Sequence, residues 1–374
     1  MPLPQPSYER YQRQIILPAF GEGGQAKLQQ SKVLVIGAGG LGCPVLQYLV
    51  AAGIGNIGIV DDDVVALSNL HRQPLFSMED IGQSKAIAAA AWLKRLNPDI
   101  NIVSYNQRLS TSNALALLQQ YEVVVDGSDN FATRYLVNDA CVLMQKPLVY
   151  GAVARFEGQV AIFNHGGTEE VPAVNYRDLF PNPPKDGEVL NCAEAGVLGI
   201  LPGIIGCMQA NETIKLITGI GKPLSNALLT YNALNNQVYE VALSANANNR
   251  WLLPADAAAF ENTNYEWLCA SADPRIEIDI DIFGGLLNND TIAIIDVREQ
   301  GEQPTPAGFD FSKMPLSNFS EAMKHISHDR VVLFCQSGKR SLQAARLLID
   351  KFGATKKISS LRGGILPWVN KHTT

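Results

Sequence analysis

A glycine-rich turn follows an apolar run near the start of the chain. Residues 32–36 read Lys-Val-Leu-Val-Ile, and residues 37–42 read Gly-Ala-Gly-Gly-Leu-Gly, which matches the pattern G-x-G-x-x-G. Glycines let the backbone turn tightly and approach phosphate oxygens, while the free N–H groups and the dipole of the following helix supply positive potential. The pattern predicts a nucleotide site. Its candidate phosphate-binding residues are Gly37, Gly39, Gly40 and Gly42.

Carboxylates, an amide and two cations follow the next predicted strand. The strand 57–60 runs into Asp61, about 20 residues after the turn, where a carboxylate can accept hydrogen bonds from a ribose. Asn69, Arg72 and Lys85 follow. When a nucleophile attacks the α-phosphorus of a nucleoside triphosphate, negative charge moves onto the leaving pyrophosphate. An amide and two cations can stabilise that charge. These residue types favour a triphosphate over a nicotinamide, and a solvated charged loop is the alternative interpretation.

A further acidic cluster follows the strand predicted at 123–125. Residues 126–130 read Asp-Gly-Ser-Asp-Asn, again at the carboxyl edge where open α/β sheets bind ligands. Asp129 is the candidate Mg²⁺ ligand, because magnesium prefers a few carboxylate oxygens together with substrate phosphates and water. The alternative is that Asp129 caps the helix predicted from Thr133.

Alternating strands and helices must position these groups. Strand patterns occur at 32–36, 57–60, 100–104, 123–125 and 147–150, and helical patterns at 41–52, 84–96, 113–120 and 133–144. The alternation predicts an α/β fold, Rossmann-like and doubly wound, with helices on both faces of a mostly parallel sheet. The β-rich runs 158–164 and 227–243 and the apolar helix 201–217 are expected to extend the same domain.

A change in composition marks the end of this domain. Residues 244–249 are small, polar and rich in asparagine, which is typical of a linker. We expect a first domain over 1–243, a linker over 244–264 and a second, small α/β domain over 265–374.

Composition limits the classes of function. The chain has 374 residues, a net charge of −6 and no Lys/Arg block with interleaved aromatics, so nucleic acid is a poor partner. No apolar run approaches the roughly 20 residues that cross a bilayer, and residues 1–10 lack a signal core. We therefore expect a soluble, cytoplasmic protein. The 6 cysteines form no C-x-x-C pair, which indicates neither a disulfide framework nor a zinc site.

Two cysteines stand outside apolar helical patterns. Cys335 ends the strand predicted at 331–334 and opens the loop Cys-Gln-Ser-Gly-Lys-Arg-Ser, which runs directly into an amphipathic helix. Backbone N–H groups, the helix N-terminus and two cations would stabilise a thiolate or persulfide there. Cys192 follows a proline-rich loop, where a thiol suits covalent capture of an activated carboxyl group. A purely structural role for either cysteine is the alternative.

Together these motifs resemble the ThiF/MoeB family, the bacterial relatives of ubiquitin-activating enzymes, which adenylate the C-terminal glycine of a small ubiquitin-like protein. The resemblance covers about residues 7–243. It rests on Tyr11 to Gln14, the glycine turn, Asp61-x-Asp63, Ser68 to Gln73, Gly82-x-x-Lys85, Asn97-Pro98, Asp126-x-x-Asp129-Asn130 with Arg134, Gly151 to Gln159, and Asn191 to Val197.

The resemblance implies a role for each matching residue. The glycine turn and Asp61 would hold the phosphates and ribose of ATP, Asn69, Arg72 and Lys85 would stabilise the transition state, and Asp129 would hold Mg²⁺. Asp63, Asn130 and Arg134 are further nucleotide-binding candidates. Arg13 corresponds to an arginine that reaches the ATP of the partner subunit, so a homodimer is implied. In relatives the cysteine matching Cys192 can form a thioester or acyl disulfide, and in some it is dispensable.

One departure from this family concerns zinc. Its members commonly carry two C-x-x-C pairs, one of them in a Cys-Tyr-Arg-Cys stretch, where this chain has Asn175-Tyr176-Arg177-Asp178. The second pair is expected shortly after Leu243, where the chain has only Ser, Ala and Asn until Arg250. Four cysteine ligands cannot be assembled, so we predict no structural zinc here.

Residues 265–372 resemble a rhodanese-like domain. The resemblance rests on the Cys335 loop, on residues 294–299 and on the closing Leu361-Arg362-Gly363-Gly364 with Trp368. The histidine-containing stretch usual in the family is missing at 308–315. Asp296 and Arg298 are expected to be structural. A persulfide on Cys335, loaded by a sulfur donor such as a cysteine desulfurase, would convert the acyl-adenylate of a sulfur carrier of the molybdopterin or thiamine type into a thiocarboxylate.

Two other functions remain open from the sequence. A non-catalytic scaffold that binds the carrier would use the rhodanese unit for docking, and the intact ATP-site residues argue against it. An NAD-dependent oxidoreductase would explain the glycine turn, but the cationic positions and the lack of a recognisable catalytic dyad disfavour it.

Overall fold

The computed structural model of the chain describes residues 5–168, 172–183, 196–265, 276–287, 289–336 and 338–372. The predicted Cys192 lies outside these residues. The chain divides into two compact units, residues 1–269 and 270–374.

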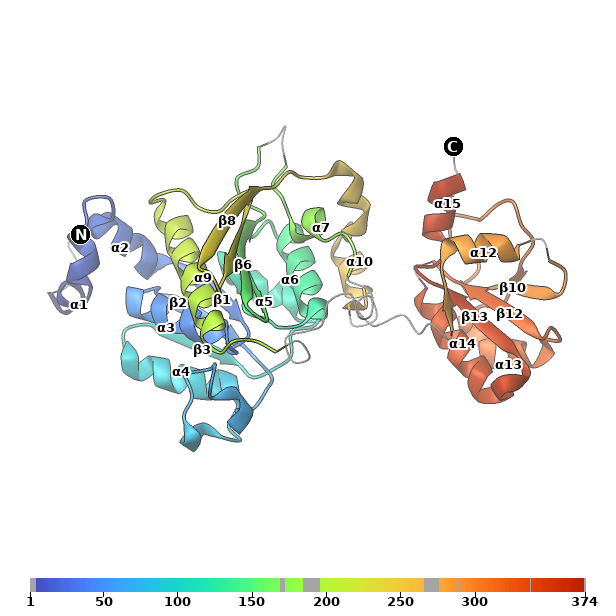
Figure 1. Cartoon of the computed structure of the whole chain (residues 1–374), viewed down its shortest axis with the longest axis horizontal. Helices are drawn as coiled ribbons and strands as arrows, with labels where there is room; N and C mark the ends of the chain where they lie inside the picture. The colour runs from blue at the N-terminus through green and yellow to red at the C-terminus, as the bar shows by residue number, and fades with distance from the viewer. Residues whose placement is uncertain are drawn as a thin grey trace. The chain divides into compact units, whose positions relative to one another are not determined.

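An eight-stranded sheet forms the centre of the first unit (Figure 1), in the order β3-β2-β1-β4-β5-β6-β7-β8. The strands from β3 to β5 pair in parallel, and β6, β7 and β8 add an antiparallel extension. The strands are β1 (Lys32–Ile36), β2 (Asn56–Val60), β3 (Asn101–Tyr105), β4 (Val123–Asp126), β5 (Leu148–Ala154), β6 (Glu157–Phe163), β7 (Ala227–Asn232) and β8 (Gln237–Ala242).

Helices cover both faces of this sheet. They are α1 (Gln5–Ile15), α2 (Gly21–Gln30), α3 (Gly42–Ala52), α4 (Lys85–Leu96), α5 (Ala114–Leu118), α6 (Phe131–Leu143), α7 (Tyr176–Leu179), α9 (Ile200–Thr218) and α10 (Ala257–Glu261), with 3-10 turns η1 (Leu67–Asn69), η2 (Met78–Asp80) and η3 (Ala247–Leu252). Val33 and Val35 of β1 join the core cluster that contains residues of α3 and α4, whereas Leu34 and Ile36 join the cluster of α5 and α6. This alternation confirms the predicted doubly wound sheet.

Most predicted elements recur within one or two residues of their bounds. The β-rich run 158–164 belongs to β6, and the run 227–243 is the β7–β8 hairpin. The two N-terminal helices, α1 and α2, were not predicted. Tyr11 of α1 is buried, so α1 packs against the rest of the first unit. Residues 244–264, expected as a linker, contain η3 and α10, and Phe260 is fully buried in the first unit. The first unit therefore extends beyond residue 243.

The second unit is built on a five-stranded parallel sheet in the order β11-β10-β12-β13-β9. Its strands are β9 (Glu277–Ile278), β10 (Ile292–Asp296), β11 (Ser312–Lys313), β12 (Arg330–Phe334) and β13 (Lys357–Leu361). Its helices are α12 (Ile280–Leu286), α13 (Phe319–Ala322), α14 (Lys339–Phe352) and α15 (Leu366–His372), with 3-10 turns η4 (Leu316–Asn318), η5 (Met323–His325) and η6 (Gly353–Thr355). Phe283, Val332 and Phe334 lie in its core, and β12 leads straight into the Cys335 loop.

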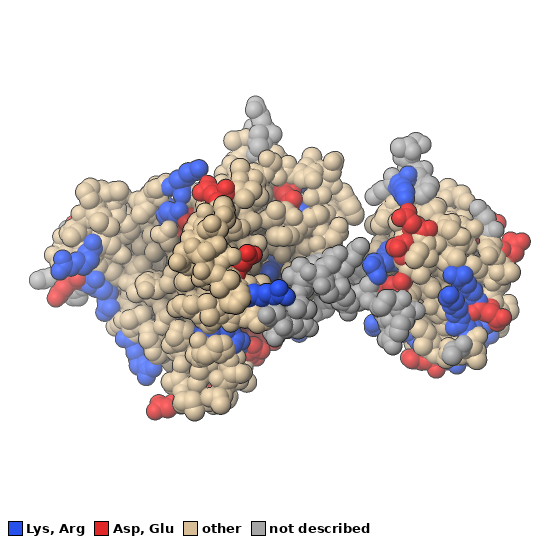
Figure 2. Space-filling model, viewed as in Figure 1, with Lys and Arg blue, Asp and Glu red and all other residues tan. Residues whose placement is uncertain are grey.

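The surface charge and the helix composition can be compared with the expectation that the protein binds neither nucleic acid nor a membrane. On the face drawn in Figure 2, basic and acidic side chains both occur on each unit, in small groups with uncharged surface between the groups. Among the described helices, none combines the length and the apolar composition that a membrane span needs.

Candidate functional site

The glycine turn lies at the point where the order of the parallel strands reverses. It follows β1, and the Gly127 N–H at the end of β4 donates to the Ile36 carbonyl oxygen at 2.8 Å. Gly37 has φ of +89°, and a Cβ on Gly42 would collide with the Gly37 carbonyl oxygen. Only glycine fits these two positions without displacing backbone. A switch point of this kind is where open α/β sheets bind ligands.

A cavity of about 500 Å³ opens at this switch point. The predicted nucleotide-site residues that line it are Gly37, Gly39, Gly40, Asp61, Asp63, Asn69, Arg72, Lys85, Asp129, Asn130 and Arg134. They come from parts of the chain up to about a hundred residues apart, and the carboxyl ends of the parallel strands bring them together. The mixture of cations, carboxylates and backbone N–H groups suits a polyphosphate.

Asp61 fixes the shape of the glycine turn. Its two carboxylate oxygens accept hydrogen bonds from the Ala38 N–H at 2.7 Å and the Asp63 N–H at 2.8 Å. Burial raises the pKa of Asp61 above its usual value, against the lowering effect of these two backbone bonds. The carboxylate therefore holds the turn and the loop after β2 in one arrangement.

Lys85 is held at the edge of the cavity by Asp63. The Lys85 Nζ lies 2.8 Å from Asp63 Oδ2, and the Lys85 N–H donates to the Asp63 carbonyl oxygen at 2.9 Å. The Lys85 side chain is 7% exposed and that of Asp63 is 69% exposed. The ammonium group therefore has a fixed position while its partner stays open to water.

The side chains of Asn69 and Arg72 are positioned by hydrogen bonds to the backbone in and beside η1. Asn69 Oδ1 accepts the Ala66 N–H at 3.0 Å, and Arg72 Nη1 donates to the Ser68 carbonyl oxygen at 2.9 Å. Both side chains line the cavity. Four of the five Arg72 N–H donors are outside this bond, which leaves capacity for phosphate oxygens.

Asp129 and Asn130 have different roles at the start of α6. Asn130 Oδ1 accepts the Thr133 N–H at 2.9 Å, so Asn130 caps the helix. The alternative interpretation of Asp129 as the cap is wrong. The Asp129 side chain is exposed and lines the cavity.

Several polar residues at or near the cavity were not predicted as site residues, and Gln73 and Asp126 are two that are buried. Gln73 is 3% exposed, its amide lies over Gly39, and its Oε1 has no hydrogen-bond partner among the described residues. Asp126 is 1% exposed, and burial raises its pKa although Arg134 acts in the opposite direction. The position of Gln73 directly after Arg72 was the signal available, but its burial depends on tertiary packing.

Three residues predicted in the first unit are not placed in this cavity. Gly42 is buried at the start of α3 and does not line the cavity. Arg13 is exposed on α1 and is not among the residues that line it. Cys192 falls outside the described residues.

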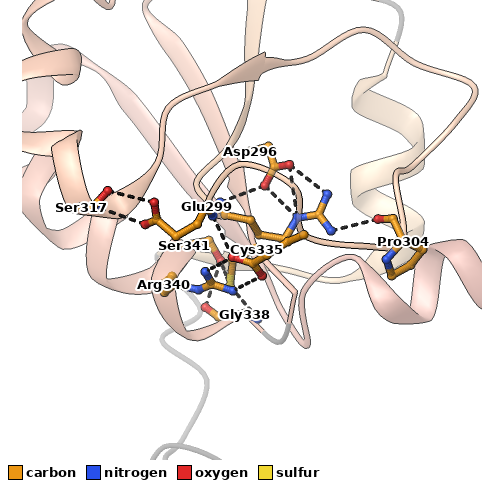
Figure 3. A network of polar contacts seen from close by, with 10 residues as sticks. Asp296, Glu299, Pro304, Ser317, Cys335, Gly338, Arg340 and Ser341 are labelled. Atoms are coloured by element: carbon orange, nitrogen blue, oxygen red, sulfur yellow. Dashed lines mark hydrogen bonds and ion pairs between the residues drawn. The ribbon is translucent and has the colours of Figure 1, made fainter. Parts of the chain in front are cut away.

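The Cys335 loop forms a second candidate site (Figure 3). Cys335 is fully buried at the end of β12, and its Sγ accepts the Gly338 N–H at 3.1 Å, with Ser341 Oγ at 3.5 Å. Gly338 has φ of +90°, which allows the loop to turn into α14. The sulfur therefore lies against the first turn of a helix, where the helix dipole favours negative charge.

Ion pairs surround this loop. Arg340 makes two parallel hydrogen bonds to the Glu302 carboxylate, with Nη2 and Oε2 2.7 Å apart, and the Glu302 pKa is lowered chiefly by this contact. Arg298 is buried and bonded to Asp296 through Nε and Nη2. The Arg298–Asp296 pair links β10 to the loop after it, which agrees with the structural role expected for both residues.

Comparison with known proteins identifies both units. Residues 11–252 match the model of the ThiF family, and residues 280–371 match that of the rhodanese-like domain. The chain is 52% identical over 238 residues to the "Sulfur carrier protein adenylyltransferase" of Thermus thermophilus, covering 64% of this chain and 88% of that protein. It is 40% identical over 373 residues to the "Probable adenylyltransferase/sulfurtransferase MoeZ" of Mycobacterium tuberculosis, covering 97% of this chain and 93% of that protein.

Solved structures agree on the fold of the first unit. E. coli MccB with ATP superposes with a TM-score of 0.55 at 21% identity, over 66% of this chain and 75% of that chain. PaaA superposes with a TM-score of 0.54 at 23% identity, over 65% of this chain and 76% of the PaaA chain. The chain belongs to the ThiF family and carries a C-terminal rhodanese-like domain.

Proposed function

We propose that the chain uses ATP to adenylate the C-terminal glycine of a small ubiquitin-like sulfur carrier and then converts that glycine to a thiocarboxylate. The observation that carries the proposal is the cavity at the β1–β4 switch point, where Arg72, Lys85 and Asp129 meet the glycine turn. The names of the Thermus and Mycobacterium relatives, which denote sulfur-carrier adenylation and combined adenylyl and sulfur transfer, support it. The carrier would be of the molybdopterin or thiamine type.

Adenylation belongs to the first unit. A carboxylate oxygen of the carrier attacks the α-phosphorus of ATP, the bond from that phosphorus to the bridging oxygen breaks, and pyrophosphate leaves. The backbone N–H groups of the glycine turn, Arg72 and Lys85 neutralise the charge that develops on the phosphates. Asp61 keeps the turn in shape through the Ala38 N–H. The protein's contribution is to position the two substrates and to stabilise charge.

The residues present fit a magnesium ion that arrives with the nucleotide. Asp129 offers an exposed carboxylate in the cavity lining and is not used as a helix cap. Among the described residues no group of three or more His, Cys, Asp or Glu side chains could hold a metal by itself. One carboxylate plus substrate phosphates and water is the arrangement that Mg²⁺ prefers. Held by Asp129, the ion would neutralise phosphate charge.

Sulfur transfer belongs to the second unit. A donor persulfide, such as that of a cysteine desulfurase, passes its outer sulfur to the Cys335 thiolate and leaves as a thiol. The outer sulfur of the Cys335 persulfide then attacks the carbonyl carbon of the acyl-adenylate, AMP leaves, and an acyl disulfide remains. The Gly338 N–H and the start of α14 stabilise negative charge on the sulfur before attack.

Release of the product requires a second thiol. A thiolate attacks the Cys335 sulfur, the sulfur–sulfur bond breaks, and the carrier leaves as the thiocarboxylate while the attacking thiol becomes disulfide-bonded to Cys335. Cys192 or an external thiol supplies this group, and a reducing dithiol restores both cysteines. A tether between the two units raises the concentration of the persulfide near the adenylate.

We further propose that the protein acts as a homodimer. Arg13 is exposed on α1 and lies outside the cavity of its own chain, which suits a role in the partner's cavity. A groove lined by Pro44, Tyr48, Ile200 and Ile204 of α3 and α9 offers an apolar surface, and Tyr48 and Ile200 are more than half exposed. An isologous contact would cover the same surface on both chains.

Mass spectrometry of the carrier tests the proposed function. The full-length protein is incubated with ATP, Mg²⁺, a persulfide donor, a thiol and a ubiquitin-like protein ending in Gly-Gly. We expect the carrier to gain the mass of one sulfur in place of one oxygen, and Cys335→Ala to prevent this gain. A carrier that binds but never changes mass, with or without ATP, would support the scaffold function instead.

A further inference from the structure

Two segments of the first unit meet where the family's zinc-binding pairs are expected. The first is Asn175-Tyr176-Arg177-Asp178 at α7, and the second is the Asn-rich stretch that contains Asn246 and Asn249 in η3. Asn175 and Asp178 have the spacing of one C-x-x-C pair, and Asn246 and Asn249 have the spacing of the other. These four residues make hydrogen bonds through side chains or backbone groups. Some of the bonds join the two segments, and the others hold one segment in shape.

Asp178 is the centre of this connection. Its Oδ2 accepts the Asn175 N–H at 2.9 Å and the Asn175 Nδ2 at 2.7 Å, within the first segment. Its Oδ1 accepts the Asn246 N–H at 2.9 Å, across to the second segment. One carboxylate therefore bonds to both segments, and charge-assisted bonds of this kind are the strong ones.

The two asparagines of the second segment complete the connection. Asn249 Nδ2 donates to the Arg177 carbonyl oxygen at 3.0 Å. Asn246 Oδ1 accepts the Asn248 N–H at 3.0 Å, which holds the start of η3 in place. We call Asn175, Asp178, Asn246 and Asn249 the polar clasp.

These residues do not suit zinc. Structural zinc sites use thiolates, imidazoles and a few carboxylates, and three of the four clasp residues are asparagines. The only carboxylate, that of Asp178, already accepts three hydrogen bonds. The donor set therefore fits hydrogen bonding between segments rather than a tetrahedral metal.

A buried network beneath the clasp extends the anchoring. Arg177 donates through Nε and Nη2 to both oxygens of Asp139 at 2.8 Å and 2.7 Å. The Tyr265 hydroxyl donates to Asp139 Oδ2 at 2.8 Å, and Tyr265 is 3% exposed. Residue 177 is thus bonded to the clasp through its carbonyl oxygen and to Tyr265 through Asp139.

We propose that the polar clasp replaces the structural zinc of this family and, with the Arg177–Asp139–Tyr265 network, fixes residues 244–265 on the first unit without a metal. The clasp and this network would then anchor the chain to the first unit as far as Tyr265. The clasp contains no thiolate, so the persulfides and oxidants of sulfur chemistry have nothing to modify there.

Metal analysis and local proteolysis of the full-length chain test this proposal. We expect purified protein to contain zinc far below one atom per chain, and a chelator to leave its thermal unfolding midpoint unchanged. Asp178→Asn should speed native-state tryptic cleavage after Arg250, inside η3, by roughly tenfold or more, because it weakens charge-assisted bonds that hold this segment. Asp99→Asn is the matched control, since Asp99 is exposed in the same unit and its side chain has no hydrogen bond in the described structure.

A gain of metal binding tests the position of the clasp. The variant N175C/D178C/N246C/N249C should bind one Co²⁺ per chain with the absorption of tetrahedral thiolate coordination, and its stability should become chelator-sensitive. If this variant does not fold, Asn249→Ala serves instead, with cleavage after Arg250 as the readout. Stoichiometric zinc in the natural protein, or unchanged cleavage after Arg250 in both Asp178→Asn and Asn249→Ala, would overturn the proposal. All these readouts are independent of whether the protein adenylates a carrier.

Discussion

Arg340 of the Cys335 loop is bonded through both terminal nitrogens to Glu302, a residue 38 positions earlier in the chain. Glu302 also accepts the Glu299 N–H at 2.7 Å, so its carboxylate is fixed from two sides. The pair is partly exposed, at 31% and 24% of the two side chains. Glu302 therefore neutralises Arg340, the arginine of the Cys335 loop.

Removing the charge of Glu302 should make the loop attract anions. In Glu302→Gln, the free charge of Arg340 should raise the rate of Cys335 alkylation by anionic iodoacetate relative to neutral iodoacetamide, on the order of threefold at low salt. Peptide mass spectrometry measures both rates. Glu321→Gln, which removes an exposed partner of Lys324, is the control. An unchanged ratio would mean that the pair has only a structural role.

Lys85 should matter for adenylation far more than for folding. Lys85→Met should lower kcat for carrier-dependent adenylation about 10²- to 10³-fold, the usual cost of losing one group that stabilises transition-state charge. Its partner Asp63 is 69% exposed and would stay hydrated, so the unfolding midpoint should change little. Lys94→Met, at the other end of α4, should leave the rate intact. Wild-type kcat in Lys85→Met would remove this lysine from the proposed mechanism.

The pairing of Arg13 with a partner's cavity predicts complementation. The variants Arg13→Ala and Lys85→Met should each have low adenylation activity alone, because a homodimer of either variant lacks one group in both cavities. After unfolding and refolding of an equal mixture, half of the dimers are mixed and one cavity of each is complete, so about a quarter of the activity should return. Activity that stays at the level of the separate variants would argue against a contribution across the dimer.

Cys43 should make stability fall at alkaline pH. Burial raises the pKa of this thiol from 9.0 to about 12, and its Sγ donates to the Ala38 carbonyl oxygen behind the glycine turn. A thiol with a raised folded-state pKa contributes stability that is present below the unfolded pKa and is lost as pH rises through the folded pKa. Between pH 9 and 12 the free energy of unfolding should therefore fall by about 1 kcal/mol per pH unit more in the wild type than in Cys43→Ala. Urea unfolding at several pH values measures the difference, and parallel curves would contradict the prediction.

The central sheet could be predicted because its strands and helices carry clear periodicities. Val33 and Val35 alternate with Leu34 and Ile36, and the glycine pattern at 37–42 leaves few other structures possible. The residues placed at strand ends were predicted to meet, and the cavity brings them together because parallel strands share one carboxyl edge.

Features that depend on long-range contacts could not be predicted. The Arg340–Glu302 pair joins the first turn of α14 to the loop after β10, and nothing in the local sequence of Glu302 indicates its partner. The segment 244–264 was expected as a linker because its composition is polar, but bonds to Asp178 and the burial of Phe260 hold it on the first unit. Asp129 and Asn130 are adjacent, and only the backbone geometry tells which one caps α6.

ATP–pyrophosphate exchange tests the central claim most directly. The full-length protein is assayed with ubiquitin-like carriers ending in Gly-Gly, beside the variants Asp129→Ala and Cys335→Ala. The account predicts exchange that needs the carrier, is lost in Asp129→Ala and persists in Cys335→Ala, because adenylation precedes sulfur transfer. Exchange that survives Asp129→Ala, or its absence with every carrier that binds, would contradict the account.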